Sequence, residues 1–158
     1  MSTLVPFSQV LWRCLGGDMR GVTAVHATHT SDADADRFLA AGGMVCLCPL
    51  TEGALGDGVP RWLRRHGLAS VCIGSDCNAR IDLLEELRAL EYAQRVTERR
   101  RGVALGAAPL AEEATHNGDL PLALLRAATL NGAESLGFNA GTKSVSYTHL
   151  TLPTILLV

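Results

Sequence analysis

The sequence of 158 residues lacks the features that would assign it to several large classes of protein. No apolar run approaches the roughly 20 residues that a membrane span requires, so no membrane association is expected. Met1 to Val10 lacks the basic start and long apolar stretch of a secretory signal peptide. The net charge of −2 gives no positive excess, and we therefore expect no nucleic-acid partner.

The cysteines also lack the pattern of a disulfide or zinc framework. There are five of them, an odd number, and no C-x-x-C pair occurs. Cys46, Cys48 and Cys72 lie in apolar runs, where free cysteine behaves as a small hydrophobic residue. This usage is typical of a reducing compartment, so we expect a cytoplasmic protein. A hydrophobic content of 47% is enough for a packed core.

Three short apolar runs, each ending in polar residues, organise the chain. They are GVTAVHATH (Gly21 to His29), GMVCLCPLTE (Gly43 to Glu52) and ASVCIGSD (Ala69 to Asp76). Helix-like segments separate the runs, and this alternation indicates parallel strands with helical crossovers. We therefore expect His26, Glu52 and Asp76 at the carboxyl edge of the sheet, where parallel α/β proteins carry their chemistry. Because a closed barrel takes eight strands, three strands form either a small open sheet or part of a larger fold.

The other segments are predicted from caps, glycines and helical periodicity. Ser31 and Asp82 are placed to cap helices, since their side-chain oxygens can accept from the free amides of a first turn. The expected helices are Pro6–Leu15, Ser31–Ala41, Pro60–Arg65, Asp82–Arg101 and Pro121–Leu136. The expected inward residues of the last two are Leu83, Leu84, Leu87 and Leu90, then Leu122, Leu125, Ala128 and Leu136. The expected loops are Thr51–Gly58, which has three glycines, and Gly102–Asp119.

His26 and Asp76 are the candidate catalytic residues. Imidazole titrates near neutral pH and can transfer a proton in either direction. A carboxylate can ligate a divalent metal, accept a proton from metal-bound water, or do both. Each residue also has a structural interpretation, His26 as a satisfied strand-end side chain and Asp76 as a turn or cap residue. Glu52 could bind a cationic or amide group, or it could satisfy loop amides.

The end of the chain breaks the pattern. VSYTHLTLPT (Val145 to Thr154) resembles, codon for codon, the translation of a transposase adaptor used in sequencing libraries. We therefore expect residues 144–158 to be an assembly artefact and residues 1–143 to be the native part.

Four segments resemble one family. VHATHTSDAD, LCPLTEGALGDG, IGSDCNARIDLLEELRALEYAQR and NGAESLG are similar to the carboxyl half of formimidoylglutamate deiminases, in the amidohydrolase superfamily. The resemblance runs from about Thr23 to Gly137. It implies an α/β fold that is part of a metal-dependent (β/α)8 TIM barrel, with residues 1–143 supplying strands six to eight and their covering helices.

The resemblance implies roles for the strand-end residues. His26 matches a sixth-strand histidine that transfers protons and stabilises an oxyanion. Asp76 matches an eighth-strand aspartate that ligates the metal and accepts a proton from its water. Glu52 falls in a motif beside the pocket and is expected to bind substrate. The implied cofactor is one zinc ion, with most ligands upstream of Met1, so this chain alone is expected to be inactive.

The implied reaction is hydrolysis of N-formimidoyl-L-glutamate to N-formyl-L-glutamate and ammonia, in histidine degradation. The full-length enzyme is expected to be a homodimer that acts on this small molecule. The chain departs from the family pattern at Leu50, where Thr is usual, and at Cys77–Asn78, where Ser-His is usual. Two alternatives therefore stay open: another deaminase of the superfamily, acting on a guanidine, an amidine or an aminated ring, and a non-catalytic α/β binding module.

Overall fold

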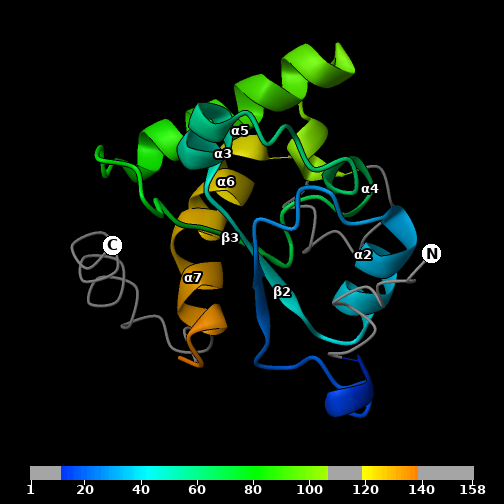
Figure 1. Ribbon diagram of the computed structural model, residues 1–158. Coiled ribbons are helices and arrows are strands. Elements are labelled where there is room, and N and C mark those ends of the chain that lie inside the picture. The colour runs from blue at the N-terminus through cyan, green and yellow to red at the C-terminus, as the bar shows by residue number, and fades with distance from the viewer. Residues whose placement is uncertain (1–11, 107–118, 139–158) are drawn as a thin grey trace.

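The three apolar runs form a parallel sheet in the computed structural model, which describes residues 12–106 and 119–138 (Figure 1). The strands are β1 (Thr23–Val25), β2 (Met44–Leu47) and β3 (Val71–Ile73), and they lie side by side in chain order. The register pairs Val25 with Cys46 and Cys46 with Cys72. The predicted parallel α/β arrangement is therefore confirmed for the described part of the chain.

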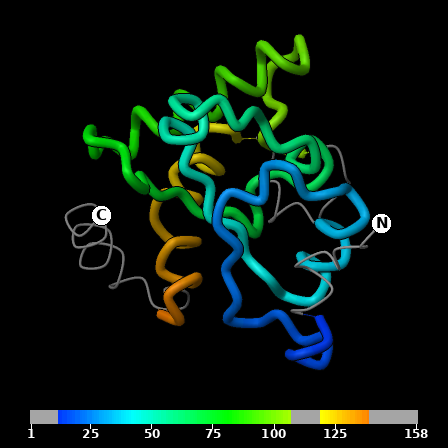
Figure 2. Tube along the Cα trace, in the orientation of Figure 1, coloured from blue at the N-terminus to red at the C-terminus, as the bar shows by residue number. Residues whose placement is uncertain are grey.

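Helices connect and cover these strands, and their path can be followed in Figure 2. They are α2 (Asp32–Ala40), α3 (Pro49–Leu55), α4 (Leu63–His66), α5 (Leu83–Glu98), the 3-10 helix η1 (Val103–Leu105), α6 (Leu120–Ala128) and α7 (Leu130–Ser135). Both predicted caps are confirmed. The Ser31 side chain accepts from the Asp34 amide, and the Asp82 side chain accepts from the amides of Leu84 and Glu85.

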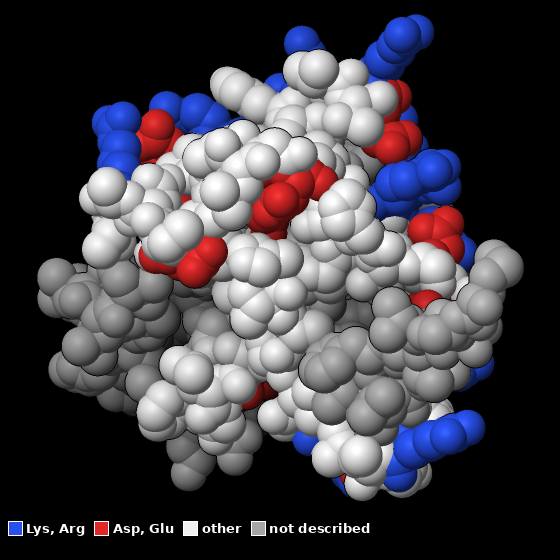
Figure 3. All heavy atoms as spheres, in the orientation of Figure 1, with Lys and Arg blue, Asp and Glu red and all other residues white. Residues whose placement is uncertain are grey.

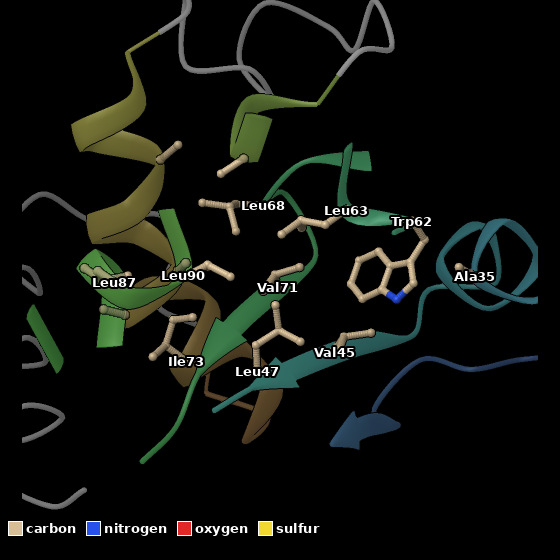
Figure 4. Packing of buried hydrophobic residues seen from close by; sticks show 14 residues of the cluster. Ala35, Val45, Leu47, Trp62, Leu63, Leu68, Val71, Ile73, Leu87 and Leu90 are labelled. Carbon is tan, nitrogen blue, oxygen red and sulfur yellow. The ribbon is translucent and has the colours of Figure 1, made fainter. Parts of the chain in front are cut away.

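One face of the sheet carries the main hydrophobic core (Figure 4). Alternate strand positions point to this face. They are Val45, Leu47, Val71 and Ile73. Leu87 and Leu90 of α5 pack toward one end of the layer, and Trp62 packs toward the other, near Ala35 of α2. Trp62 is completely buried, and its Nε1 donates to the carbonyl of Ala27 at 3.0 Å. Trp62 thereby ties the turn after β1 to the core.

The segment Thr51–Gly58, predicted to be a loop, is helical as far as Leu55. Pro49 occupies the start of α3, where its fixed φ suits a helix and its missing N–H leaves no bond unmade. Gly56 follows the last helical residue with a φ of 73°, the left-handed conformation that commonly ends helices. The prediction was wrong because at least one of the glycines ends a helix rather than loosening a loop.

The predicted helix Pro121–Leu136 is two helices, α6 and α7, which meet at Thr129. The expected inward leucines of this segment are wrong: Leu122, Leu125 and Leu136 are 46%, 49% and 72% exposed. The buried residues of α6 are Ala123, Ala127 and Ala128. Leu84 of α5 is also exposed, whereas Leu87 and Leu90 are buried as predicted. Small alanine side chains allow α6 to pack closely against β3, so periodicity of leucine alone misplaced its buried face.

Some predictions fall wholly or partly outside the described residues. These are most of the helix Pro6–Leu15, of which residues 12–14 are helical, the later part of the loop Gly102–Asp119, and the boundary between 1–143 and 144–158. On the face shown in Figure 3, lysine and arginine side chains lie mainly toward the margins. No helix in the described ranges is both long and apolar enough to cross a membrane.

We predict that Gly67→Ala destabilises the chain, because Gly67 has a φ of 64° and a ψ of −158°, a region that is essentially restricted to glycine. A Cβ here would also lie 2.6 Å from the carbonyl oxygen of Leu105. The conformation alone should cost roughly 1–3 kcal/mol of unfolding free energy. Gly132→Ala is the control, since a Cβ at Gly132 meets nothing within 4 Å and alanine favours a helix. Equal denaturation midpoints for the two variants would contradict the prediction.

Candidate functional site

The carboxyl edge of the sheet brings three side chains together. Nδ1 of His26, directly after β1, lies 3.1 Å from Oε1 of Glu52 in α3. Nε2 of the same ring lies 3.6 Å from Oδ2 of Asp76, which follows β3. The side chains of His26 and Asp76 are 35% and 38% exposed, whereas that of Glu52 is 4% exposed. The predicted convergence of these residues is therefore observed, with the imidazole between two carboxylates, one buried and one open.

The backbone at this edge adopts an uncommon conformation. His26 and Asp76 have φ angles of 65° and 50°, and Ala27, the residue after His26, has a φ of 50°. Non-glycine residues seldom have positive φ, although Asp and His do so more often than most, and such positions cluster at functional sites. The backbone amide of His26 still donates to Cys46 O at 2.8 Å. The chain therefore turns sharply at the end of β1 while its backbone stays bonded to β2.

Glu52 lies in the first turn of α3, and one of its carboxylate oxygens contacts both the His26 ring and a backbone amide. Its Oε1 accepts from the Cys48 amide at 2.9 Å as well as facing Nδ1 of His26. This amide lies at the start of α3, where the helix itself offers no acceptor, and Glu52 supplies one. The buried position of Glu52 and its two partners favour a role in orienting His26. The predicted contact between Glu52 and substrate stays a prediction.

Two further residues fix α3 to its surroundings, and sequence reasoning missed both. Oγ1 of Thr51 donates to the carbonyl of Ser75 at 3.0 Å, which joins α3 to the residue before Asp76. Oε2 of Glu86, a completely buried residue of α5, accepts from the Leu50 amide at 2.8 Å. A buried glutamate within a leucine-rich helix is the signal that could have marked Glu86, because a buried charge needs a partner.

The donors present do not complete a metal site. In the described part of the chain, no group of three or more His, Cys, Asp and Glu side chains is arranged to hold a metal ion. Asp76 offers one carboxylate to such an ion, and a four-coordinate zinc site takes three or four protein ligands. The described residues thus fit at most a part of a metal shell.

Three thiols lie on the sheet face opposite the core. Cys46 and Cys72 are register partners on β2 and β3, and a Cβ on Gly74 would lie within 3.1–3.3 Å of the sulfurs of Cys46 and Cys48. The hydrogen bond with Cys48, together with burial, raises the pKa of Cys46 to about 12. The hydrogen bond with Cys46, together with burial, raises the pKa of Cys72 well above its ordinary value. Cys46 and Cys72 therefore stay protonated near neutral pH, so these two thiols are neither nucleophiles nor ready metal ligands.

A prediction follows from Glu86. Burial raises the pKa of Glu86 above its ordinary value of 4.5. The hydrogen bond from the Leu50 amide lowers this pKa, and the nearby carboxylates of Glu52 and Glu85 raise it further. Because the folded chain then binds this proton more tightly than the unfolded chain, stability from Glu86 is fullest below pH 4.5 and falls as pH rises through the raised pKa. Relative to the wild type, Glu86→Gln should therefore gain stability as the pH rises from below 4.5 toward neutral.

The measurement is urea unfolding of both chains across this pH range. Glu98→Gln, which removes a carboxylate from the other end of α5 and not from the surroundings that raise the pKa of Glu86, is the control and should not reproduce the trend. A stability difference between wild type and Glu86→Gln that does not change with pH would contradict the raised pKa of Glu86.

Known proteins resemble both the sequence and the fold. Formimidoylglutamate deiminase from Pseudomonas aeruginosa is 34% identical over 127 residues, covering 77% of this chain and 25% of that protein. The 5-methylthioadenosine/S-adenosylhomocysteine deaminase from Pyrococcus abyssi is 30% identical over 128 residues, covering 78% of this chain and 27% of that protein. The chain thus spans about a quarter of the length of these relatives.

A solved structure of similar fold also comes from this group of enzymes. A crystal structure of an amidohydrolase from Brucella melitensis superposes with a TM-score of 0.63 and 33% sequence identity, covering 87% of this chain and 30% of that one. The amidohydrolase fold is a (β/α)8 barrel whose members are generally metal-dependent, and the parallel sheet described here is consistent with a part of it. The model of the amidohydrolase family matches residues 13–145, and the chain belongs to that family.

Proposed function

We propose that the chain is part of a metal-dependent hydrolase that deaminates N-formimidoyl-L-glutamate to N-formyl-L-glutamate and ammonia. Water adds to the formimidoyl carbon, and the C–N bond to the terminal nitrogen breaks to release ammonia. The observation that carries the proposal is the imidazole of His26 held between Glu52 and Asp76 at the carboxyl edge of the sheet. The similarity to formimidoylglutamate deiminase over 77% of the chain supports this substrate.

The two partly exposed side chains divide the proton transfers in this proposal. Asp76 accepts a proton from the attacking water, because its carboxylate is partly open to solvent at the edge of the sheet and faces Nε2 of His26. His26 takes up a proton on Nε2, the ring nitrogen that faces Asp76, then stabilises charge that develops on the adding oxygen and passes the proton toward the leaving nitrogen. An imidazole ring can transfer a proton in either direction.

Several features of the proposal need parts of a protein longer than this chain. Zinc is the proposed cofactor, with Asp76 as one ligand and the others from residues upstream of Met1. The assignment of residues 1–143 to strands six to eight of a barrel is likewise a proposal, as is the exclusion of residues 144–158. The homodimer, the cytoplasmic location and the place in histidine degradation stay predictions.

A second class of substrate, the adenine nucleosides, is also included in the test. The relative from Pyrococcus abyssi is a 5-methylthioadenosine/S-adenosylhomocysteine deaminase, and it matches nearly the same share of the chain. The substitution pattern Cys77–Asn78, which adjoins Asp76, is where this chain departs from the formimidoylglutamate deiminases. An amidine and an adenine nucleoside are therefore the two substrates that the test compares.

We predict that the full-length protein releases ammonia from N-formimidoyl-L-glutamate faster than from 5-methylthioadenosine. Asp76→Asn and His26→Gln should each lower turnover by roughly 10²- to 10⁴-fold, the usual contribution of general acid–base catalysis. Their melting temperatures should change by only a few degrees, since these half-exposed side chains contribute little to the core. Turnover and thermal melting are measured on the same preparations.

The matched control is His29→Gln, which alters an exposed histidine three residues along the same loop and should keep near-normal turnover. Near-normal turnover in both Asp76→Asn and His26→Gln would contradict the assignment of the site. Faster ammonia release from 5-methylthioadenosine would instead replace the proposed substrate while keeping the deaminase reaction.

A further inference from the structure

The inference concerns the proton on the imidazole of His26, and its catalytic meaning rests on the proposed function. A neutral histidine carries one proton, on Nδ1 or on Nε2, and the other nitrogen is then an acceptor. Which form is present decides whether the nitrogen facing the site can accept a proton or can only donate one. The hydrogen-bond partners of the ring are the physical basis for assigning the form.

We propose that Glu52 is a positioning residue that holds neutral His26 with its proton on Nδ1, leaving Nε2 unprotonated and facing Asp76. Oε1 of Glu52 lies 3.1 Å from Nδ1 and already accepts from the Cys48 amide at 2.9 Å. This oxygen is already the acceptor of the Cys48 amide, so an attractive contact with it at this distance requires Nδ1 to be the donor. The opposite form would place two lone pairs against each other at the same separation.

The environment of Glu52 makes this preference strong. The side chain is 4% exposed, so water competes little for its oxygen. Its position is fixed from both sides, because the first turn of α3 is bonded to Glu86 through the Leu50 amide and to Ser75 through Thr51. The backbone of His26 is fixed as well, by its amide bond to Cys46 O. Both partners are thus held in place before any substrate arrives.

The consequence for the reaction is that Nε2 is available to take a proton. Nδ1 stays engaged with Oε1 of Glu52 at 3.1 Å, while Nε2 lies 3.6 Å from Oδ2 of Asp76 on the open side of the ring. Glu52 therefore acts on the reaction through His26 without needing to contact the substrate.

His66 offers an internal comparison within the same chain. Its Nε2, not its Nδ1, lies 2.6 Å from a carboxylate oxygen, Oδ1 of Asp36. By the same reasoning, neutral His66 carries its proton on Nε2. The structure thus predicts opposite forms for the two histidines.

The test is nitrogen-15 NMR of the full-length protein with labelled histidine, above the pH at which imidazoles are protonated. Signals are assigned with His26→Gln and His66→Gln. We expect a protonated-type shift for Nδ1 and an unprotonated-type shift for Nε2 in His26, with the reverse in His66. A proton on Nε2 of His26, with His66 as expected, would overturn the proposal.

Two substitutions test the cause. Glu52→Gln keeps an oxygen acceptor and should keep the proton on Nδ1, whereas Glu52→Leu removes the acceptor and should move the proton to Nε2. Turnover in Glu52→Leu should fall by about 10²-fold or more with little change in KM, and Glu52→Gln should restore part of it. Unchanged His66 signals show that each variant is folded. If Glu52→Leu does not fold, the spectra of the wild type and of Glu52→Gln still show which nitrogen of His26 carries the proton.

Thr51→Val is the matched control. It removes a buried hydrogen bond of α3 that does not touch His26, and it should leave the proton on Nδ1. A proton shift in Thr51→Val equal to that in Glu52→Leu would show that general loosening of α3 is the cause, and would overturn the specific role of Glu52. Failure of the protein to use N-formimidoyl-L-glutamate would overturn the proposed substrate but not the NMR result.

Discussion

One oxygen atom, Oε1 of Glu52, joins the end of β2 to the side chain that follows β1. It accepts a hydrogen bond from the amide of Cys48, the N-cap residue of α3, and it lies against the ring of His26. The pairing needs α3 to begin immediately after β2, because a longer connection would carry Glu52 away from the edge. The short turn through Pro49 is therefore as much a part of the site as the charged groups.

The sequence predicted the convergence of His26 and Asp76 but not the bond that holds the histidine. Parallel strands of similar length bring their carboxyl ends to the same edge, so strand-end residues can be placed together from apolar runs alone. The bond to Glu52 depends on α3 being a helix, which its glycines concealed. The positive φ angles of His26 and Asp76 were equally invisible, because tertiary contacts such as Trp62 to Ala27 stabilise conformations that local preference disfavours.

The helices show the same division between local and tertiary causes. Caps were predicted well, since Ser31 and Asp82 act on amides two or three residues away. The buried face of α6 was predicted badly, because its neighbours decide whether alanine or leucine is covered. Asn131 of α7 illustrates what periodicity cannot show: its Nδ2 donates to the carbonyls of Leu68 and Val71, more than sixty positions earlier in one case. Packing of this kind is settled only when the whole fold is formed.

The protonated thiols on the sheet have a practical consequence for anyone who wishes to observe the site. Maleimides and iodoacetamides react with thiolates. Because their pKa values are raised, Cys46 and Cys72 stay protonated near neutral pH and react slowly with these reagents. Cys77, by contrast, is exposed and adjoins Asp76. With the other exposed thiol, Cys14, replaced by serine, a fluorescent or spin label would attach one residue from the carboxylate. The chain thus carries its own attachment point for a reporter at the edge of the sheet.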